Sequence, residues 1–307
     1  RKGEPAALHK WGIRSCGVRY AVVRVLARWL SAGMVKVAIC APGKRLERDR
    51  ADAVLDIAAG DPAVELQFHP QCFARHGHFA GDDATRLAAF LECANDPGID
   101  AVWFGMGGYG ANRIAADAIA GLQDAAKTKK YLGYSDNGYL LAALYKAGIG
   151  QAVHAPLVGD IRRDGGDAAI RRVLSYLAGN EDGLEPSLDG TPTVAFNLTT
   201  LAMLVGTDLM PDLSGHVVMV EEVAEHLYAV DRLFFHVTQH LQGISGLKLG
   251  RISAVPENDR PFGASPEDIA RYWCDKSGIS YLGFADIGHD AANTIVPFGL
   301  AGTASGA

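Results

Sequence analysis

The chain has 307 residues, which is enough for one large domain or two domains of ordinary size. Hydrophobic residues make up 49% of it and charged residues 21%, so it can bury a core, and this composition argues against a largely disordered protein. The formal net charge of -6 argues against a protein that binds nucleic acid by general electrostatic attraction.

The first 33 residues differ from the rest of the chain. Segment 19–30, RYAVVRVLARWL, carries arginines within an apolar run and no acidic residue. It is too short and too charged to span a membrane, and a signal peptide would place its arginines ahead of the apolar run. Three interpretations remain: a transit-like or membrane-surface segment, a surface helix, or residues upstream of the true start. We favour the third because Met34 immediately precedes a clear first strand, and we treat residues 1–33 as an atypical extension.

From Met34 onwards, segments typical of strands alternate with segments typical of helices. The pattern predicts strands at 35–42, 64–69, 100–105, 130–135 and 151–156, with helices between them at 50–59, 82–96, 112–122 and 138–148. Such alternation favours a parallel sheet with helices on both faces, whose ligand site lies at the carboxyl ends of the strands. We therefore expect an N-terminal α/β domain over residues 34–157.

The pattern changes after residue 157. Residues 158–193 hold one helix and then a polar run rich in glycine, proline and aspartate, which is typical of a linker. Beyond it the sequence predicts two short strands, an amphipathic helix and a further apolar segment, at 194–198, 216–222, 228–241 and 247–255. Another helix and a glycine-rich tail follow. These features predict a smaller, mixed α+β C-terminal domain over residues 194–307.

A glycine-rich run, GMGGYG (residues 105–110, the glycine loop), directly follows the third predicted strand. Its first, third and last residues have the spacing of a dinucleotide-binding loop. Three features argue against that use: the loop belongs to the third strand–helix unit, Gly108 is an extra glycine, and the following acid, Asp136, comes too late. Two other interpretations remain open. The glycines can form a tight turn for backbone reasons, or the loop can direct backbone N–H groups at a developing negative charge.

Ser135 stands where the fourth predicted strand meets the following helix. Loops that follow neighbouring parallel strands open at the same edge of the sheet, so Ser135 is expected near the glycine loop, as in a nucleophile elbow. The sequence differs from the G-x-S-x-G form of that elbow, because Asn137 takes the place of the second glycine. The alternative is that Ser135 or Asp136 caps the helix that begins near Gly138.

A serine nucleophile needs a base, and the base needs an acid that orients it. His289 follows Gly288 in a glycine-flanked turn of the tail, and Glu221 and Glu222 end an apolar strand. Because side chains alternate along a strand, these two acids lie on opposite faces of the sheet, and only one can reach the histidine. The simpler alternatives are a polar surface histidine and two solvated acids at a strand end.

Residue types that bind zinc gather before the helix at 82–96, namely His69, Cys72, His76 and His78. Their spacing fits no standard zinc finger. A second pair, His236 and His240, lies four residues apart on a predicted helix but lacks the glutamate of H-E-x-x-H. We predict no metal site. The five cysteines are scattered without a C-x-x-C pair, which favours a reducing compartment over a disulfide framework.

Taken together, these motifs resemble the LD-carboxypeptidase family of serine peptidases, which includes murein tetrapeptide carboxypeptidases and microcin C self-immunity peptidases. VAICAP is similar to the family's opening strand, and HGHFAGDDATRLAAF, GGYGANRI, LGYSD and VHAPL follow in the family's order. The segments GTDLMPDLSGHVVMVEEVAEHLYAVDR and IGHDAANTIVPFG are similar to those that carry the family's catalytic glutamate and histidine. The resemblance runs from about Val35 to the C-terminus.

The resemblance implies a catalytic triad in which Ser135 is the nucleophile and His289 the general base. Glu221, the first acid of the pair, would orient the imidazole. We therefore expect Glu221→Gln to cripple catalysis and Glu222→Gln to have a mild effect.

Further site residues are implied around the glycine loop. The backbone N–H groups of Gly108 and Asp136 would form the oxyanion hole. We expect Gly107, Tyr109 and Arg113 in the substrate site, because a peptide with a free carboxylate needs a positive partner and Arg113 is the nearest candidate.

The resemblance also implies a flavodoxin-like N-terminal domain, a smaller C-terminal domain, a site between them and a homodimer. It implies neither a metal nor a nucleotide cofactor. We expect a cytoplasmic enzyme whose partner is a small peptide substrate, without nucleic-acid or membrane partners.

The sequence departs from the family pattern at a few positions outside the triad. The departures are Met106 for an arginine, Asn137-Gly138 for Ile-Thr, Ala195-Phe196 for a glycine pair, and the loss of a proline before Gly288-His289. They bear on the identity of the substrate more than on the type of reaction.

For the substrate we predict a murein tetrapeptide, cleaved at its terminal D-alanine. The first alternative is a self-immunity-type peptidase that acts on aminoacyl-nucleotide conjugates, and such a site needs an aromatic platform on which the base stacks. The stretch 158–192 contains no tryptophan, and Tyr176 is its only aromatic residue. The second alternative is a non-catalytic ligand binder on the same scaffold.

Overall fold

The computed structural model describes residues 33–300. The expected N-terminal extension, residues 1–33, lies outside the described residues except for Gly33. The chain divides into two units, residues 1–34 and 35–307, and the fold described below belongs to the second. In the part of the chain that the structure describes, no helix has the length and apolar character needed to cross a bilayer.

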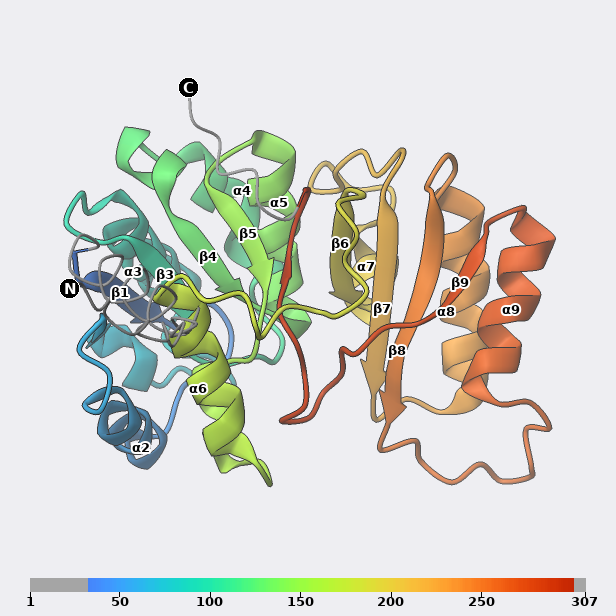
Figure 1. Ribbon diagram of the computed structural model, residues 1–307, viewed down its shortest axis with the longest axis horizontal. Coiled ribbons are helices and arrows are strands. Elements are labelled where there is room, and N and C mark those ends of the chain that lie inside the picture. Colours follow the sequence, from blue (N-terminus) through green and yellow to red (C-terminus); the bar gives the residue numbers. More distant parts are fainter. Residues whose placement is uncertain (1–32, 301–307) are drawn as a thin grey trace, which may run out of the picture. The chain divides into compact units, whose positions relative to one another are not determined.

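The first sheet has six strands in the order β10-β5-β4-β3-β1-β2. Five of them are parallel and lie at the predicted positions: β1 (Val35–Cys40), β2 (Val64–Phe68), β3 (Ala101–Phe104), β4 (Lys130–Gly133) and β5 (Gln151–His154). The short β10 (Val296–Pro297) pairs antiparallel with β5. The order β2-β1-β3-β4-β5 is that of a flavodoxin-like sheet, so the predicted fold class is confirmed (Figure 1).

Helices cover both faces of this sheet (Figure 1). One face packs against α2 (Arg48–Ala58) and α6 (Gly166–Leu177), and the other against α3 (Asp83–Asn95), α4 (Asn112–Ala120) and α5 (Gly138–Ala147). Along β1, Val37 and Ile39 are buried in the core on the face covered by α2 and α6. Ala38 and Cys40 are buried in the core on the face covered by α3, α4 and α5. Burial on both faces explains why these strands are almost continuously apolar.

The sequence predicts a linker at residues 158–193. In the structure, the first part of this segment packs on the first sheet. It opens with the short helix η4 (Val158–Arg162) and continues into α6. Ile170 and Val173 of α6 are buried in the same core cluster as Ile39. The polar run after α6 then leads to the second sheet.

The second sheet is also parallel, with the strand order β6-β7-β8-β9. Its strands are β6 (Thr193–Asn197), β7 (Val217–Val223), β8 (Gly246–Ser253) and β9 (Tyr281–Phe284), joined by α7 (Leu198–Leu204), α8 (Leu227–His240) and α9 (Pro266–Ser277). The sequence did not predict α7 or β9. α7 is only seven residues long, and β9 contains Gly283 at a φ of 85°.

The last part of the chain connects the two sheets. After β9 the chain crosses the face of the second sheet opposite its helices, where Ile287 packs with Ala195 and Met219. It then pairs as β10 with β5 at the edge of the first sheet. The loop between β9 and β10, which carries His289, is thus fixed to both sheets.

Candidate active site

Ser135 lies at the junction predicted from the sequence. It begins the short helix η3 (Ser135–Asn137) between β4 and α5, and its φ is 60°. This left-handed conformation costs a non-glycine residue about 1–2 kcal/mol, and such strain concentrates at functional sites. The capping alternative is not observed. Asn137 is the N-cap of α5 and makes no side-chain cap bond, and the side chains of Ser135 and Asp136 bond elsewhere.

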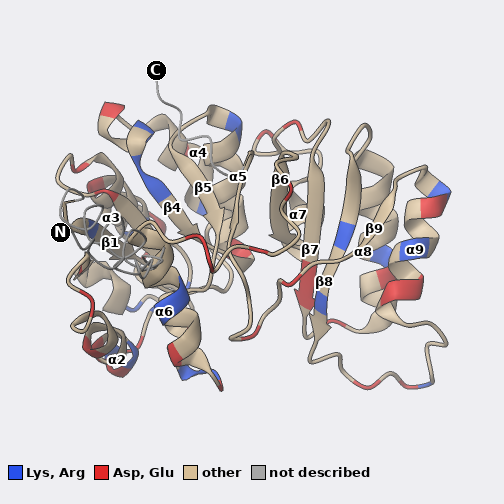
Figure 2. Ribbon diagram, in the orientation of Figure 1, with Lys and Arg blue, Asp and Glu red and all other residues tan. Residues whose placement is uncertain are grey.

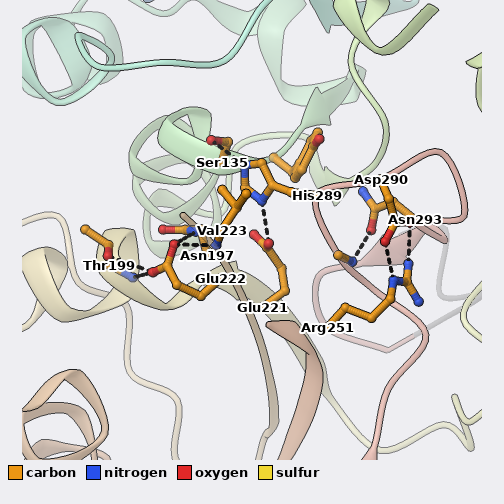
Figure 3. Close-up of polar contacts among 12 residues, drawn as sticks. Ser135, Asn197, Thr199, Glu221, Glu222, Val223, Arg251, His289, Asp290 and Asn293 are labelled. Carbon is orange, nitrogen blue, oxygen red and sulfur yellow. Dashed lines mark hydrogen bonds and ion pairs between the residues drawn. The ribbon is translucent and has the colours of Figure 1, made fainter. Parts of the chain in front are cut away.

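Three predicted residues form a hydrogen-bonded row (Figure 3). His289 Nε2 lies 3.1 Å from Ser135 Oγ, and His289 Nδ1 is hydrogen-bonded to Glu221 Oε2. The imidazole is mostly buried and Glu221 is fully buried. A histidine held between a hydroxyl and a carboxylate in this way can accept the hydroxyl proton and be stabilised in its charged form.

The two acids that end β7 face different partners, and Figure 2 shows the acidic end of this strand. Burial raises the pKa of Glu221, and the hydrogen bond from His289 opposes this rise. Glu222 points to α7 instead. Its carboxylate accepts hydrogen bonds from Asn197 Nδ2 at 2.7 Å and from the Thr199 N–H at 2.8 Å.

The glycine loop lies against Ser135 and against side chains of other segments. A Cβ added to Gly107 would lie 3.4 Å from Ser135 Oγ. Gly108 has a φ of 84°, and a Cβ there would lie 2.2 Å from Cδ of Lys44. A Cβ on Gly110 would lie 2.9 Å from a guanidinium nitrogen of Arg86. The positive φ of Gly108 and Gly110, together with the close approach of neighbouring groups there, accounts for these two glycines.

Hydrogen bonds of Asp136 connect the glycine loop to the junction between β4 and α5, where Ser135 lies. Its Oδ2 accepts hydrogen bonds from the N–H groups of Gly110 at 2.9 Å and Ala111 at 2.8 Å. Burial raises the pKa of this carboxyl, while the two backbone hydrogen bonds lower it. Within residues 33–300, the N–H groups of Gly108 and Asp136 donate no hydrogen bond to another residue.

Known protein families match both parts of the chain. Residues 37–155 match the LD-carboxypeptidase N-terminal domain, and residues 191–303 match the LD-carboxypeptidase C-terminal domain. The chain belongs to the LD-carboxypeptidase family. The predicted resemblance is therefore confirmed, and the protein is a serine-type carboxypeptidase.

Individual relatives cover most of the chain. The murein tetrapeptide carboxypeptidase of Pseudomonas aeruginosa is 26% identical over 290 residues, which span 86% of this chain and 91% of that protein. The muramoyltetrapeptide carboxypeptidase of Oxalobacter formigenes has a solved structure that is 25% identical, with a TM-score of 0.72 over 85% of this chain and 93% of that one. The microcin C7 self-immunity protein MccF is 17% identical, with a TM-score of 0.73 over 88% of this chain and 92% of that one. The MccF match shows the fold alone.

The loop that carries His289 in this LD-carboxypeptidase is held by contacts that the sequence did not predict. Asn293 Oδ1 accepts a hydrogen bond from the Gly288 N–H at 3.1 Å and lies 3.0 Å from His154 Nε2. Arg172 of α6 donates to the carbonyl oxygen of Asn293 at 2.9 Å. His154 and Asn293 lie within the VHAPL and IGHDAANTIVPFG motifs, which could have identified them.

Ion pairs with a residue of β8 also hold the loop that carries His289. Arg251 forms ion pairs with Asp286 and Asp290, which flank His289 in the sequence. Figure 3 shows Arg251 beside Asp290. A Cβ on Gly288 would lie 2.7 Å from Arg251 Nε, so the loop needs glycine there. No sequence motif marked Arg251, because its role depends on a loop that follows much later in the chain.

The aromatic and histidine side chains packed near His289 are uncharged. The ring of Tyr134 lies 4.8 Å from the imidazole of His289 and 5.4 Å from that of His154. Burial lowers the pKa of His154 to about 4, so it is neutral at pH 7. Burial also raises the pKa of Tyr134 well above its usual range, so its hydroxyl stays protonated and donates to Asp160. Neither group carries a charge that competes with Glu221 for the imidazolium.

Two residues expected in the substrate site, Tyr109 within the glycine loop and Arg113 just after it, contact side chains of other segments. Tyr109 is half exposed and its ring packs near Phe79. Arg113 is already paired: its Nε donates to Asp83 Oδ1 at 3.0 Å and to Oδ2 at 2.9 Å, and its Nη2 donates to Oδ2 at 2.6 Å. The hydrogen bond with Asp83 raises the pKa of Arg113. A substrate carboxylate would have to compete with Asp83 for this guanidinium.

Three of the side chains considered as zinc ligands, His69, Cys72 and His240, have other hydrogen-bond partners. His69 Nε2 lies 2.9 Å from Glu92 Oε2, and the thiol of the buried Cys72 donates to the Ile39 carbonyl oxygen. His240 Nδ1 lies 2.9 Å from the carbonyl oxygen of His236. Among the described residues, no three His, Cys, Asp or Glu side chains are arranged to hold a metal ion.

The role of Asp136 leads to a testable expectation. Asp136→Ala leaves the Gly110 and Ala111 N–H groups without their acceptor, so the glycine loop loosens beside Ser135 and kcat falls by up to about 100-fold. Asp136→Asn keeps an oxygen that can accept both bonds and should retain most of the activity. Steady-state kinetics of the two variants compare them directly. Equal losses in both would mean that the charge of Asp136, and not the hydrogen bonds, matters.

Proposed function

We propose that this carboxypeptidase removes the terminal D-alanine of a murein tetrapeptide, with Ser135, His289 and Glu221 as its catalytic triad. The hydrogen bonds from Ser135 Oγ through the imidazole to Glu221 carry the proposal. Relatives whose names include murein tetrapeptide carboxypeptidase support the choice of substrate.

The first half of the reaction forms an acyl-enzyme. His289 Nε2 takes the proton from Ser135 Oγ as the oxygen attacks the carbonyl carbon of the scissile amide. The carbonyl oxygen becomes an oxyanion, which the N–H groups of Gly108 and Asp136 stabilise. His289 then gives its proton to the amide nitrogen, the C–N bond breaks, and D-alanine leaves.

The second half releases the shortened peptide. His289 takes a proton from a water molecule, which attacks the ester carbonyl, and the proton returns to Ser135 Oγ as the C–O bond breaks. Glu221 keeps the imidazole oriented and stabilises its positive charge in both halves. Because Glu221 is fully buried, water screens this interaction little.

A second candidate function is cleavage of an aminoacyl-nucleotide conjugate. It is favoured by the likeness to MccF, which has been solved in complex with aspartyl sulfamoyl adenosine. A nucleobase needs an exposed ring on which to stack. Tyr176, the aromatic residue of segment 158–192, is buried, and Lys130 lies over its ring at 4.4 Å. This arrangement supports the murein peptide over the conjugate.

Incubation with both substrates tests the choice. We expect mass spectrometry to show release of D-alanine from the murein tetrapeptide, with the aminoacyl-nucleotide conjugate left intact. The Ser135→Ala variant serves as the blank for each digest. Cleavage of the conjugate alone would exclude the proposed substrate and favour the second candidate.

A non-catalytic binder is the remaining alternative, and an active-site serine probe distinguishes it. The proposed triad predicts covalent labelling that Ser135→Ala abolishes, whereas a binder would not be labelled. The homodimer and the cytoplasmic location expected from the resemblance stay predictions.

A further inference from the structure

Two basic side chains flank the glycine loop on the side of β1. Lys44 is exposed, and its side chain lies along Gly108, where a Cβ would be 2.8 Å from Cγ of Lys44. Arg50, in the first turn of α2, is half buried and donates to Met106 Sδ at 3.6 Å. A thioether is a weak acceptor, so this contact satisfies little of the hydrogen-bonding capacity of a guanidinium.

The acids nearest to this pair in the sequence are used by other bases. Glu47 pairs with Arg45 at 2.6 Å, and Asp49 pairs with Arg162 at 2.7 Å. Within residues 33–300, no carboxylate forms an ion pair with Lys44 or Arg50. Among the described residues, these two positive charges beside the proposed oxyanion hole therefore have no carboxylate in an ion pair with them.

The fold places these charges where a ligand is expected. In the order β2-β1-β3-β4-β5, the direction of chain progression reverses between β1 and β3. Open parallel sheets bind their ligands in the crevice at such a point, outside the carboxyl ends of the strands. The loop after β1 carries Lys44, and the loop after β3 is the glycine loop (Figure 1). The two loops are in close contact, since a Cβ on Gly43 would lie 2.2 Å from the Gly108 carbonyl oxygen.

We propose that Lys44, with Arg50 behind it, binds the free carboxylate of the leaving amino acid. The proposal rests on the proposed function and specifies how that site selects a terminal residue. A carboxypeptidase must recognise a carboxylate one residue beyond the scissile carbonyl, which itself lies at the oxyanion hole. Lys44 contacts the loop that supplies this hole. Arg113, the cation expected from the sequence, already donates hydrogen bonds to both carboxylate oxygens of Asp83.

Two substrates that differ only at the terminal carboxylate measure the interaction of this group with Lys44. One is the murein tetrapeptide with its free terminal carboxylate, and the other is the same peptide ending in a carboxamide. The measurement is the ratio of kcat/KM for the acid to kcat/KM for the amide. Lys44→Met keeps the length of the side chain over Gly108 but removes the charge, and it should lower this ratio on the order of 10- to 100-fold.

Three further variants test whether the change in the acid-to-amide ratio depends on the positive charges of Lys44 and Arg50. Lys44→Arg should keep the preference for the acid, and Arg50→Met should weaken it. Arg45→Met, which removes a neighbouring, partly buried charge already paired with Glu47, should leave the ratio at the wild-type value. Thermal melting checks that each variant is folded.

The outcomes separate this proposal from the function on which it rests. A lower ratio in Lys44→Met and Arg50→Met, with wild-type behaviour of Arg45→Met, supports it. An unchanged ratio in Lys44→Met, with normal wild-type cleavage of the tetrapeptide, overturns the role of Lys44 and leaves the proposed function intact. A wild-type enzyme that cleaves neither peptide contradicts the proposed function itself.

Discussion

Replacing Ser135 by alanine is expected to abolish release of the terminal amino acid. The proposed mechanism has no second nucleophile, because His289 Nε2 is directed at Ser135 Oγ. Loss of a triad member commonly lowers kcat by about 10,000-fold or more, and the remaining rate comes from binding and the oxyanion hole. Steady-state kinetics on the murein tetrapeptide measure this loss. Wild-type turnover by Ser135→Ala would contradict the mechanism.

A glycine variant at the same position controls for the backbone. Ser135 has a φ of 60°, which alanine adopts at a cost and glycine adopts freely. Ser135→Gly should therefore be as inactive as Ser135→Ala but more stable, by on the order of 1 kcal/mol. Thermal or denaturant unfolding of the two variants tests this order. Equal stabilities would indicate that the backbone at this position relaxes when the side chain is removed.

Glu221→Gln should have the second largest effect on catalysis. Glutamine keeps an oxygen that can accept a hydrogen bond from His289 but loses the negative charge that stabilises the imidazolium. The corresponding change in a serine triad lowers kcat by about 10,000-fold. A kcat within a few-fold of wild type would exclude Glu221 as the acid of the triad.

The same substitution should not destabilise the fold. Because burial raises the pKa of Glu221, the folded chain holds this proton more tightly than the unfolded chain does. The resulting contribution to stability is fully present below the unfolded pKa and is lost as the pH rises through the folded pKa. At pH 7 the buried charge therefore opposes folding, and Glu221→Gln should melt no lower than wild type. A clearly lower Tm would contradict this account of the buried carboxylate.

Glu222→Gln is the matched control, and its effect should fall on stability. The Glu222 carboxylate is 2% exposed and accepts hydrogen bonds from Asn197, from the Val223 N–H, and from both the N–H and the hydroxyl of Thr199. A glutamine NH₂ would face two of these donors and leave them unpaired, at a cost of about 1–3 kcal/mol. The sequence-based expectation of a mild effect on catalysis stays a prediction: turnover should remain far above that of Glu221→Gln, and the hydrogen bonds of Glu222 add the expectation of a lower Tm.

The sequence by itself determined the positions of the five parallel strands of the first sheet and the position of Ser135. These strands lie where the pattern predicted them, because hydrophobic periodicity reports on burial within a few neighbouring residues. The pattern missed β9, whose four residues include a glycine at positive φ, because so short a segment shows no clear period.

Tertiary structure decided which side chains meet. His289 and Ser135 are 154 residues apart, and only the return of the chain to β5 as β10 brings them together. Periodicity carries no information about such contacts, because they depend on how whole sheets and loops pack. Arg113, the cation expected from the sequence for the substrate, stays a prediction. The fold adds what the sequence does not show: Arg113 pairs with Asp83, and Lys44 lies beside the glycine loop, since the partner of a charge depends on segments that come close only on folding.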